Sequence, residues 1–201
     1  MAPARTPARP LPLRRQPNQA RSRDKVARAL AAADDLLDEA GPDALTLNRV
    51  AERAGLTAGA LHQYLPDRDA IVEVLAARYH ERLEALMVDA MARPADPQAD
   101  DPIGTTLAAV AEVYRDTAAL RSLRLGHQGT SSRAHKQRMA AHLARALAAR
   151  GLVDGATAER VAPVIFFAAD GVVQEAFRRE PGGDPDLLEE LGSMLRAYLS
   201  R

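Results

Sequence analysis

The residues whose chemistry is most specific lie in one short segment, TLNRVAERAGLTAGALHQYL, which covers positions 46–65. Its second half places small side chains beside the hydrogen-bonding groups of His62 and Gln63, and no acidic residue interrupts them. The amide of Gln63 can form two hydrogen bonds with one adenine, and small neighbours allow a helix to enter a major groove. This combination indicates a segment that reads the base edges of double-stranded DNA.

Two short helices joined by a tight turn are needed to present these groups. Thr46 can cap the first helix and Thr57 the second, because a threonine hydroxyl accepts hydrogen bonds from the free N–H groups of a first turn. Gly55 lies between them, where a helix commonly ends in a left-handed residue that glycine adopts without strain. Leu61 and Leu65 supply apolar anchors for the second helix. The spacing therefore predicts a helix-turn-helix.

The same residues resemble a known family. The segments TLNRVAERAGLT, AGALHQYL and PDRDAIVEVLAARY are similar to the N-terminal signature of the TetR (tetracycline repressor) family of one-component transcriptional regulators, over roughly residues 22–80. The resemblance implies an all-α fold, in which a three-helix helix-turn-helix domain precedes a helical domain that binds a ligand and dimerises. It implies a repressor that binds a palindromic operator as a homodimer and is released by a small-molecule effector. The positions that match the family's DNA contacts are Thr46, Thr57, Ala58, Gly59, Ala60, His62, Gln63, Tyr64 and Arg68.

Two of these positions depart from the residues that the family usually has. His62 stands where tyrosine is most common, and Ala58 stands where a longer polar or basic side chain is often found. Few direct base contacts are therefore expected, and Gln63 is the strongest candidate for one. Two roles stay open at this point, because Thr57 could serve only as a helix cap and Tyr64 could belong to the core.

Composition favours one large or two small helical domains. The chain has 201 residues, of which 47% are hydrophobic and only 3% aromatic, so a core of Leu, Val and Ala is expected. The absence of cysteine excludes disulfides and thiolate metal sites. No apolar run approaches the roughly 18–20 residues that span a bilayer, so we expect a soluble, cytoplasmic protein without a membrane partner.

Charge is distributed unevenly, although the formal net charge is zero. Residues 1–25 contain seven basic side chains and one acidic side chain. Such a Pro- and Arg-rich stretch cannot bury enough apolar area to fold, which predicts a disordered tail over 1–20. A DNA-binding domain over 21–67 and an effector-binding and dimerisation domain over 68–201 are expected to follow. The tail could add salt-dependent affinity for DNA, or it could have no role.

Apolar periodicity and capping residues predict the remaining elements. A first helix is expected over 22–40, a long fourth helix after Asp67, and a break over 93–102 before the pattern restarts at Ile103. The later expectations are a short helix over 119–126, a turn over 127–132, a helix that stops at Gly151, a long helix from a Thr157 cap to Arg179, and a last helix opened by Asp184 and Pro185.

The last two expected helices are apolar around more than one side, so another layer should cover part of their surface. A second subunit can cover it, as the family resemblance implies, although a thick core within one chain would also do so. The residues expected at the dimer interface are Val172, Val173, Phe177, Leu188, Leu191, Leu195 and Tyr198. The effector pocket is expected between the central helices, with the candidate wall residues Tyr79, Leu83, Leu107, Tyr114, Leu123, His127, Leu143, Phe166, Phe167 and Asp170.

Catalysis is not expected, because no pattern of catalytic or metal-binding residues occurs. The five histidines include no HExxH set and no Glu-x-x-His pair, and there is no nucleophile elbow or Gly-rich phosphate loop. His135 and His142 could share a helix face, but the sequence shows no nearby carboxylate that would complete a metal site. No cofactor is expected. The alternative function is a helical ligand-binding or interaction protein without specific DNA binding.

Overall fold

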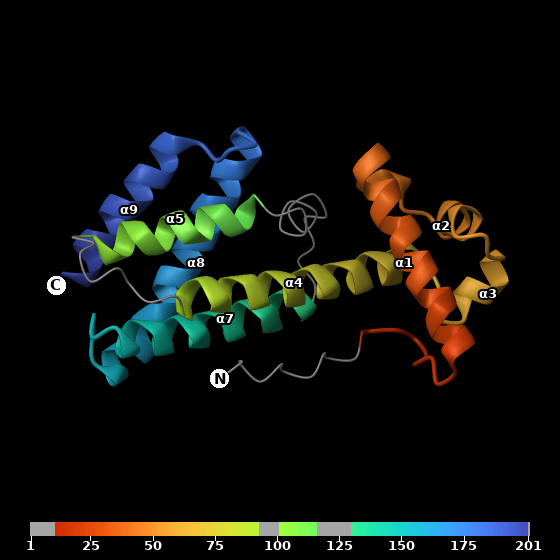
Figure 1. Cartoon of the computed structure of the whole chain (residues 1–201), viewed down its shortest axis with the longest axis horizontal. Helices are drawn as coiled ribbons and strands as arrows, with labels where there is room; N and C mark the ends of the chain where they lie inside the picture. Colours follow the sequence, from red (N-terminus) through yellow and green to blue (C-terminus); the bar gives the residue numbers. More distant parts are fainter. Residues whose placement is uncertain (1–10, 93–100, 116–129, 201) are drawn as a thin grey trace. The chain divides into compact units, whose positions relative to one another are not determined.

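The computed structural model describes residues 11–92, 101–115 and 130–200, and these residues form helices with no strand among them (Figure 1). The all-α fold expected from the sequence is confirmed. The chain divides into two compact units, Met1–Arg78 and Tyr79–Arg201, and the dividing point lies within one long helix, α4 (Arg68–Ala92). None of the helices in the described ranges has the length and apolar character that crossing a bilayer requires.

The first unit is built around α1 (Ala20–Ala40), against which α2 (Leu47–Arg53) and α3 (Ala58–His62) pack. The 3₁₀ turn η1 (Pro42–Ala44) leads from α1 toward α2 after Gly41, whose φ of 76° ends the first helix. Aliphatic side chains from these helices and from the first turns of α4 fill the core. The fully or almost fully buried ones include Leu30, Leu37, Val50, Leu61, Leu65, Ile71 and Leu75.

The helix-turn-helix expected over 46–65 is formed, and its caps are the expected residues. The hydroxyl oxygen of Thr46 accepts a hydrogen bond from the Arg49 N–H at 3.3 Å, and that of Thr57 accepts from the Ala60 N–H at 3.2 Å. Gly55 turns the chain between the helices with a φ of 64°. Each signal acts within a few residues, which is why the sequence alone predicts this corner.

The second unit packs the later turns of α4 with four further helices that the structure describes. These are α5 (Pro102–Tyr114), α7 (Thr130–Ala149), α8 (Gly155–Arg179) and α9 (Pro185–Leu199). α7 packs along α8, and α9 packs against both α8 and α5 (Figure 1). The core between them holds mainly aliphatic side chains, with the rings of Tyr114 and Phe177 stacked at a centroid distance of 5.5 Å.

The start of α7 differs from the sequence expectation. Because the helix begins at Thr130, residues 130–132 are helical and do not belong to the turn expected over 127–132. Residues 127–129 and the short helix expected over 119–126 lie outside the described residues.

The start of α8 also differs, because Asp154 and not Thr157 caps this helix. The Asp154 carboxylate accepts hydrogen bonds from the Thr157 N–H at 2.9 Å and from the Thr157 hydroxyl at 2.7 Å. An ionised carboxylate is a stronger acceptor than a hydroxyl, so it captures the first free N–H groups and the helix starts at Gly155. These bonds hold the pKa of Asp154 below its usual value.

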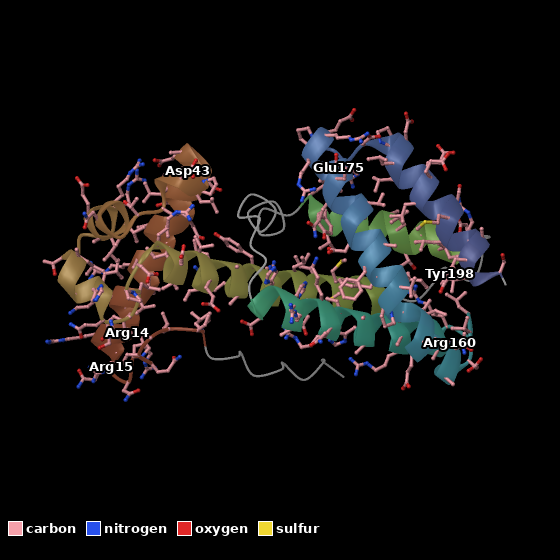
Figure 2. The ribbon with its side chains drawn as sticks, turned by 180° about the vertical axis from the view of Figure 1, so that it is seen from behind. Arg14, Arg15, Asp43, Arg160, Glu175 and Tyr198 are labelled. Atoms are coloured by element: carbon pink, nitrogen blue, oxygen red, sulfur yellow. The ribbon has the colours of Figure 1, made fainter. Side chains whose placement is uncertain are left out.

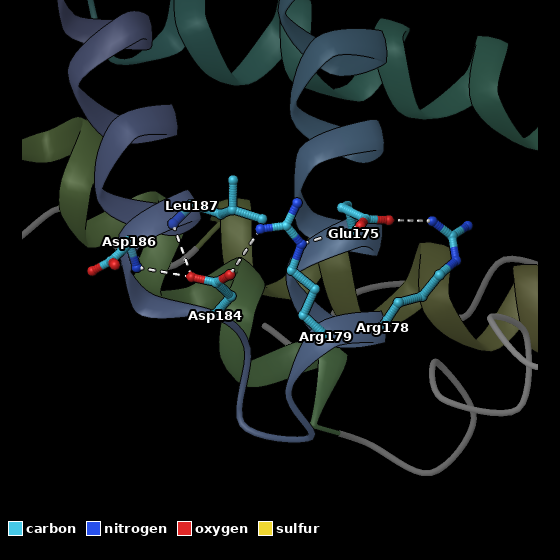
Figure 3. A network of polar contacts seen from close by, with 6 residues as sticks. All are labelled: Glu175, Arg178, Arg179, Asp184, Asp186 and Leu187. Carbon is cyan, nitrogen blue, oxygen red and sulfur yellow. Dashed lines mark hydrogen bonds and ion pairs between the residues drawn. The ribbon is translucent and has the colours of Figure 1, made fainter.

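A polar network fixes the turn between α8 and α9 (Figure 3). Asp184 caps α9 as expected, since its Oδ1 accepts from the N–H groups of Asp186 and Leu187 at 3.1 and 3.2 Å. Its Oδ2 lies 3.4 Å from Nη1 of Arg179, and Nε of that arginine lies 3.2 Å from Glu175 Oε1. The cap of one helix is thereby tied to the last turns of the other.

Candidate nucleic-acid interface and ligand cavity

The outward face of α3 carries most of the residues that the sequence assigns to DNA contact. Gly59, His62 and Gln63 are exposed, and Ala58 and Ala60 are half-buried beside them. No acidic residue lies in α3 or at its two caps. The face therefore offers small side chains, an imidazole and an amide, a combination that allows close approach to base edges and phosphates.

The two cap threonines are exposed as well as hydrogen-bonded. A hydroxyl oxygen that accepts from a backbone N–H still carries a proton that it can donate. Thr46 and Thr57 can therefore cap their helices and donate to a phosphate at the same time. The two roles open for Thr57 do not exclude each other.

Tyr64 lies in the core of the first unit and not on the outward face. Only 8% of this residue is exposed, so its ring is packed inside the protein. Of the two roles that the sequence leaves open for Tyr64, this burial favours the core.

Arg68 is exposed but folded back on its own unit. Its Nη2 donates to the Pro42 carbonyl at 3.1 Å and lies 3.9 Å from Asp43 Oδ1. A guanidinium has five N–H donors, so Arg68 can keep this bond and still meet a phosphate. Its predicted role in DNA binding is compatible with this geometry.

His62 is oriented by one partner at each ring nitrogen. Its Nδ1 lies 2.9 Å from the Pro66 carbonyl oxygen, and because a carbonyl can only accept, Nδ1 carries the proton. Its Nε2 lies 3.5 Å from Nη1 of Arg14, which donates to it. Sequence reasoning found the positive charge of the segment that contains Arg14, but the disorder expected over 1–20 is wrong for the described residues 11–20. The Arg14 N–H donates to the Tyr64 carbonyl at the end of α3, and such a contact between distant segments gives no local sequence signal.

Other arginines of the first unit hold its helices together. Arg53 of α2 donates to both carboxylate oxygens of Glu39 in α1, at 2.9 and 2.7 Å, and these bonds lower the pKa of Glu39. Arg28 of α1 pairs with Asp24 at 3.1 Å and donates to the Ala54 carbonyl at 3.3 Å. The charges of Arg28 and Arg53 are therefore paired with carboxylates of the first unit.

The second unit encloses a cavity of about 110 Å³. Side chains from α4, α5, α7, α8 and α9 form its walls, and nearly all of them are aliphatic or aromatic. Five of the predicted wall residues line it: Leu107, Tyr114, Leu143, Phe166 and Asp170. The lining also includes Met87, Ile103, Thr106, Val110, Met139, Ala146, Leu147, Arg150, Leu152, Ile165, Ala169, Val173, Leu195 and Leu199.

The other predicted wall residues are placed elsewhere. Tyr79 and Leu83 are buried without lining the cavity, and Phe167 is 52% exposed. Phe166 and Phe167 are consecutive on a helix and point about 100° apart, and of the two only Phe166 lines the cavity. Leu123 and His127 lie outside the described residues.

A polar cluster at Asp170 interrupts the apolar wall. Oδ1 of Asp170 accepts from the Tyr114 hydroxyl at 3.1 Å and from Gln174 Nε2 at 2.8 Å, and Oδ2 lies 2.9 Å from Lys136 Nζ. Burial, and then the charge of Asp170, raises the pKa of Tyr114 well above its usual value. Sequence reasoning missed Lys136 and Gln174, although the spacing of four residues between Asp170 and Gln174 is a usable signal.

Comparison with known proteins covers both units. Residues 29–75 match the family model of bacterial regulatory proteins of the tetR family, and residues 100–199 match that of the tetracyclin repressor-like C-terminal domain. The tetracycline repressor protein class A from transposon 1721 of Escherichia coli is 30% identical over 174 residues, which make up 85% of this chain and 74% of that protein. The chain belongs to the TetR family.

Solved structures of TetR-family proteins have the same fold. A TetR-family transcriptional regulator from Streptomyces coelicolor superposes with a TM-score of 0.61 at 30% identity, over 88% of this chain and 98% of that one. The triclosan complex of SmeT from Stenotrophomonas maltophilia gives a TM-score of 0.57 at 19% identity, over 87% and 89% of the two chains, and shows the fold alone. This TetR-family chain is thus a DNA-binding transcriptional regulator with a helix-turn-helix domain and a C-terminal helical domain.

Most of the predicted interface residues of this TetR-family chain lie inside its second unit. Val173, Phe177, Leu191 and Leu195 are at most 8% exposed and form part of the core, which corrects their assignment to an interface. The remaining predicted residues are half-buried against the same core; they are Val172, Leu188 and Tyr198.

Other apolar side chains of α8 and α9 are open to solvent. Val164 and Phe167 of α8 are 54% and 52% exposed, and Met194 of α9 is 46% exposed. Sequence reasoning missed Val164 and Met194 as surface residues, because a helix that is apolar on several sides gives no sign of which stripe faces inward.

A cluster of histidines and one carboxylate joins α4 and α7. The rings of His80 and His135 stack with centroids 4.7 Å apart, and Glu84 lies 3.7 Å from His135 Nδ1 and 3.4 Å from His142 Nε2. The expectation that no carboxylate lies near His135 and His142 was wrong, since the carboxylate comes from another helix. Glu84 also accepts from Arg138 Nε at 2.8 Å, and in the described part of the chain no three such groups are placed to hold a metal ion.

Proposed function

We propose that this chain is a repressor that binds a palindromic operator as a homodimer and leaves it when a small molecule fills the cavity of the second unit. The observation that carries the proposal is the outward face of α3, which combines the exposed Gly59 and the half-buried Ala58 and Ala60 with the exposed amide of Gln63 and lacks acidic groups. Gln63 reads a base, and Thr46, Thr57 and Arg68 contact phosphates.

Pairing with a second copy of the chain would allow the protein to bind an inverted repeat. The exposed side chains of Val164, Phe167 and Met194 give α8 and α9 an apolar surface that a twofold-related copy would cover. A twofold dimer presents two α3 helices, so its operator has two related half-sites.

The cavity provides the place for an effector. Its walls are apolar apart from the Asp170 cluster and the Arg150–Thr106 hydrogen bond of 2.6 Å, which suits a compact, mainly apolar molecule with one or two polar groups. The structure of SmeT with triclosan supports a ligand role for this fold. Met87 of α4 lines the cavity, and the same helix begins in the DNA-binding unit, so α4 offers a covalent route for coupling. Occupancy would shift the population toward a form with low operator affinity.

Membership of the TetR family also supports a cytoplasmic protein that works by binding and not by catalysis. A helical ligand-binding protein without specific DNA binding is the alternative, and DNA selection separates the two.

The test is a selection of random double-stranded DNA with the full chain, with Gln63→Ala, and with Gln137→Ala as the matched control. Gln137 is an exposed glutamine of α7 in the second unit. We expect the wild type and the control to recover the same inverted repeat, and Gln63→Ala to lose its base preference at one position of each half-site. Recovery of DNA without any common sequence by the wild type would support the alternative.

A further inference from the structure

The segment that precedes α1 is in contact with the end of α3. Figure 2 shows Arg14 and Arg15 next to each other on the side of the first unit that carries α3. The backbone N–H of Arg14 donates to the Tyr64 carbonyl at 3.1 Å. Tyr64 follows directly after the C-terminal cap of α3, where carbonyl groups lack helical partners. The Arg14 N–H therefore supplies a hydrogen-bond donor to a carbonyl at the end of α3.

The side chains of the segment divide into an inner and an outer set. Leu11, Leu13 and Pro17 are half-buried, whereas Arg14 and Arg15 are exposed. A turn holds this arrangement, because the Leu11 carbonyl accepts from the Leu13 N–H at 2.8 Å and from Gln16 Nε2 at 2.7 Å. Apolar residues thus anchor the segment, while Arg14 and Arg15 stay exposed and the Arg14 guanidinium reaches Nε2 of His62.

The two arginines differ from the basic residues that brace this unit. Arg28, Arg53 and Arg68 each lie within 4.0 Å of a carboxylate oxygen. Within the described ranges, neither Arg14 nor Arg15 takes part in such an ion pair. Two positive charges without a paired carboxylate therefore lie next to the face proposed to read DNA. The helix-turn-helix pattern does not require these charges.

We propose that Arg14 and Arg15 bind the phosphate backbone of the operator, and that His62 is a positioning residue that holds Arg14 in place. This inference rests on the proposed function of α3. Guanidinium groups bind phosphate through charge-assisted, often bidentate hydrogen bonds, and a non-helical segment can follow the backbone beside the groove that α3 enters. His62 accepts from Arg14 through Nε2 while the Pro66 carbonyl fixes its other nitrogen, so His62 acts through the tail and not by touching DNA.

The first test compares the salt dependence of operator binding for the full chain and for Arg14→Ala/Arg15→Ala. Arg82→Ala/Arg133→Ala is the matched control, because it removes two exposed arginines from the second unit. Loss of two phosphate contacts should lower the slope of log K against log salt by about 2 for each protomer and weaken binding at low salt by about tenfold or more. The control should retain the wild-type slope. A slope unchanged in Arg14→Ala/Arg15→Ala would overturn the inference.

The second test asks whether His62 acts through Arg14. His62→Ala and Arg14→Ala should each reduce affinity and slope to a similar extent, and the double variant should lose little more than either single one. His62→Gln, which keeps an acceptor near the position of Nε2, should retain most of the wild-type slope. Additive losses in the double variant would show that His62 contacts DNA independently and would overturn its positioning role.

The outcomes distinguish this inference from the proposed function. A wild type that selects no operator overturns both. A wild type that binds an inverted repeat through Gln63, with Arg14→Ala/Arg15→Ala unchanged in slope and affinity, overturns the inference alone. Far-ultraviolet circular dichroism of each variant confirms that the helices are retained.

Discussion

Gln63 and His62 are neighbours in the sequence, yet the structure gives them different surroundings. Gln63 ends α3 and its side chain is exposed, whereas both ring nitrogens of His62 have partners in the protein. An exposed amide can exchange water for a base edge, but a bonded imidazole must first give up its partners. These surroundings support the proposed roles, base reading for Gln63 and positioning of Arg14 for His62.

At the scale of one residue, the Asp154 cap of α8 should make the stability of the folded state depend on pH. Hydrogen bonds from Thr157 lower the pKa of Asp154 below the ordinary value of 3.8, so the ionised cap stabilises the folded state above that pH. This contribution is lost as the pH falls through the lowered pKa. In Asp154→Asn the cap cannot ionise, although asparagine still caps a helix.

We expect the wild type to have the higher melting temperature at neutral pH, and the difference from Asp154→Asn to shrink below about pH 4. Thermal unfolding followed by circular dichroism at a series of pH values measures this. Glu159→Gln removes a carboxylate from the same helix without removing its cap and serves as the control. A difference that stays constant across the series would contradict the assignment of the cap.

At the scale of elements, the glycines and capping residues in the sequence predict where the helices begin and end. The corner at Gly55 and the start of α9 at Asp184 agree with expectation, because each depends on residues within one helical turn. The inward and outward stripes of α8 did not follow from the sequence, since Phe166 and Phe167 have the same hydrophobicity and only packing selects between them. Contacts between distant segments, such as Arg14 with Tyr64, leave no periodic signal at all.

Two turn glycines should respond differently to substitution. Gly41 and Gly183 both have left-handed backbones, with φ of 76° and 85°. A Cβ at Gly183 would lie 3.0 Å from the Phe177 ring and 3.1 Å from Leu188, whereas a Cβ at Gly41 would meet nothing within 4 Å. Gly41→Ala should cost about 1–3 kcal/mol from backbone strain alone, because φ of 76° with ψ of −177° is a region that almost only glycine occupies. Gly183→Ala should cost about 1–3 kcal/mol more from overpacking.

Urea unfolding of both glycine variants measures these costs. The wild type is the reference, and the two variants control for each other because both replace a glycine of positive φ. Equal losses of unfolding free energy would show that the turn after α8 can open to accept a side chain.

The cavity can be tested with a probe that needs no knowledge of the effector. Xenon enters apolar cavities, so the wild type should shift the ¹²⁹Xe resonance. Ala169 lines the cavity and the adjacent Ala168 does not. Ala169→Phe should abolish the shift and Ala168→Phe should keep it. The same shift in both variants would contradict the placement of the cavity.

At the scale of the whole molecule, the exposed apolar residues of α8 and α9 form the surface proposed to join two chains. Phe167→Asp would place a charge in the proposed interface, where burial of an unpaired carboxylate is costly. We expect the wild type to have twice the 21.6 kDa mass of the chain and Phe167→Asp to have the mass of one chain. Light scattering after size-exclusion chromatography gives both masses.

Ala141→Asp, on the exposed side of α7, controls for the added charge and should remain a dimer. A dimer for Phe167→Asp would show that another surface joins the subunits. The same variant should also bind the operator more weakly, because a monomer presents only one α3 helix.

Operator reading by α3 is tested most directly by the preference for operator over other DNA, measured for the wild type and for Gln63→Ala at one salt concentration. A sequence-specific dimer should bind its selected inverted repeat at least about 10³-fold more tightly than shuffled DNA of equal length. Gln63→Ala should reduce this ratio by about tenfold or more without changing the affinity for shuffled DNA. Equal binding of both DNAs by the wild type, or an unchanged ratio for Gln63→Ala, would contradict the claim that α3 reads the operator.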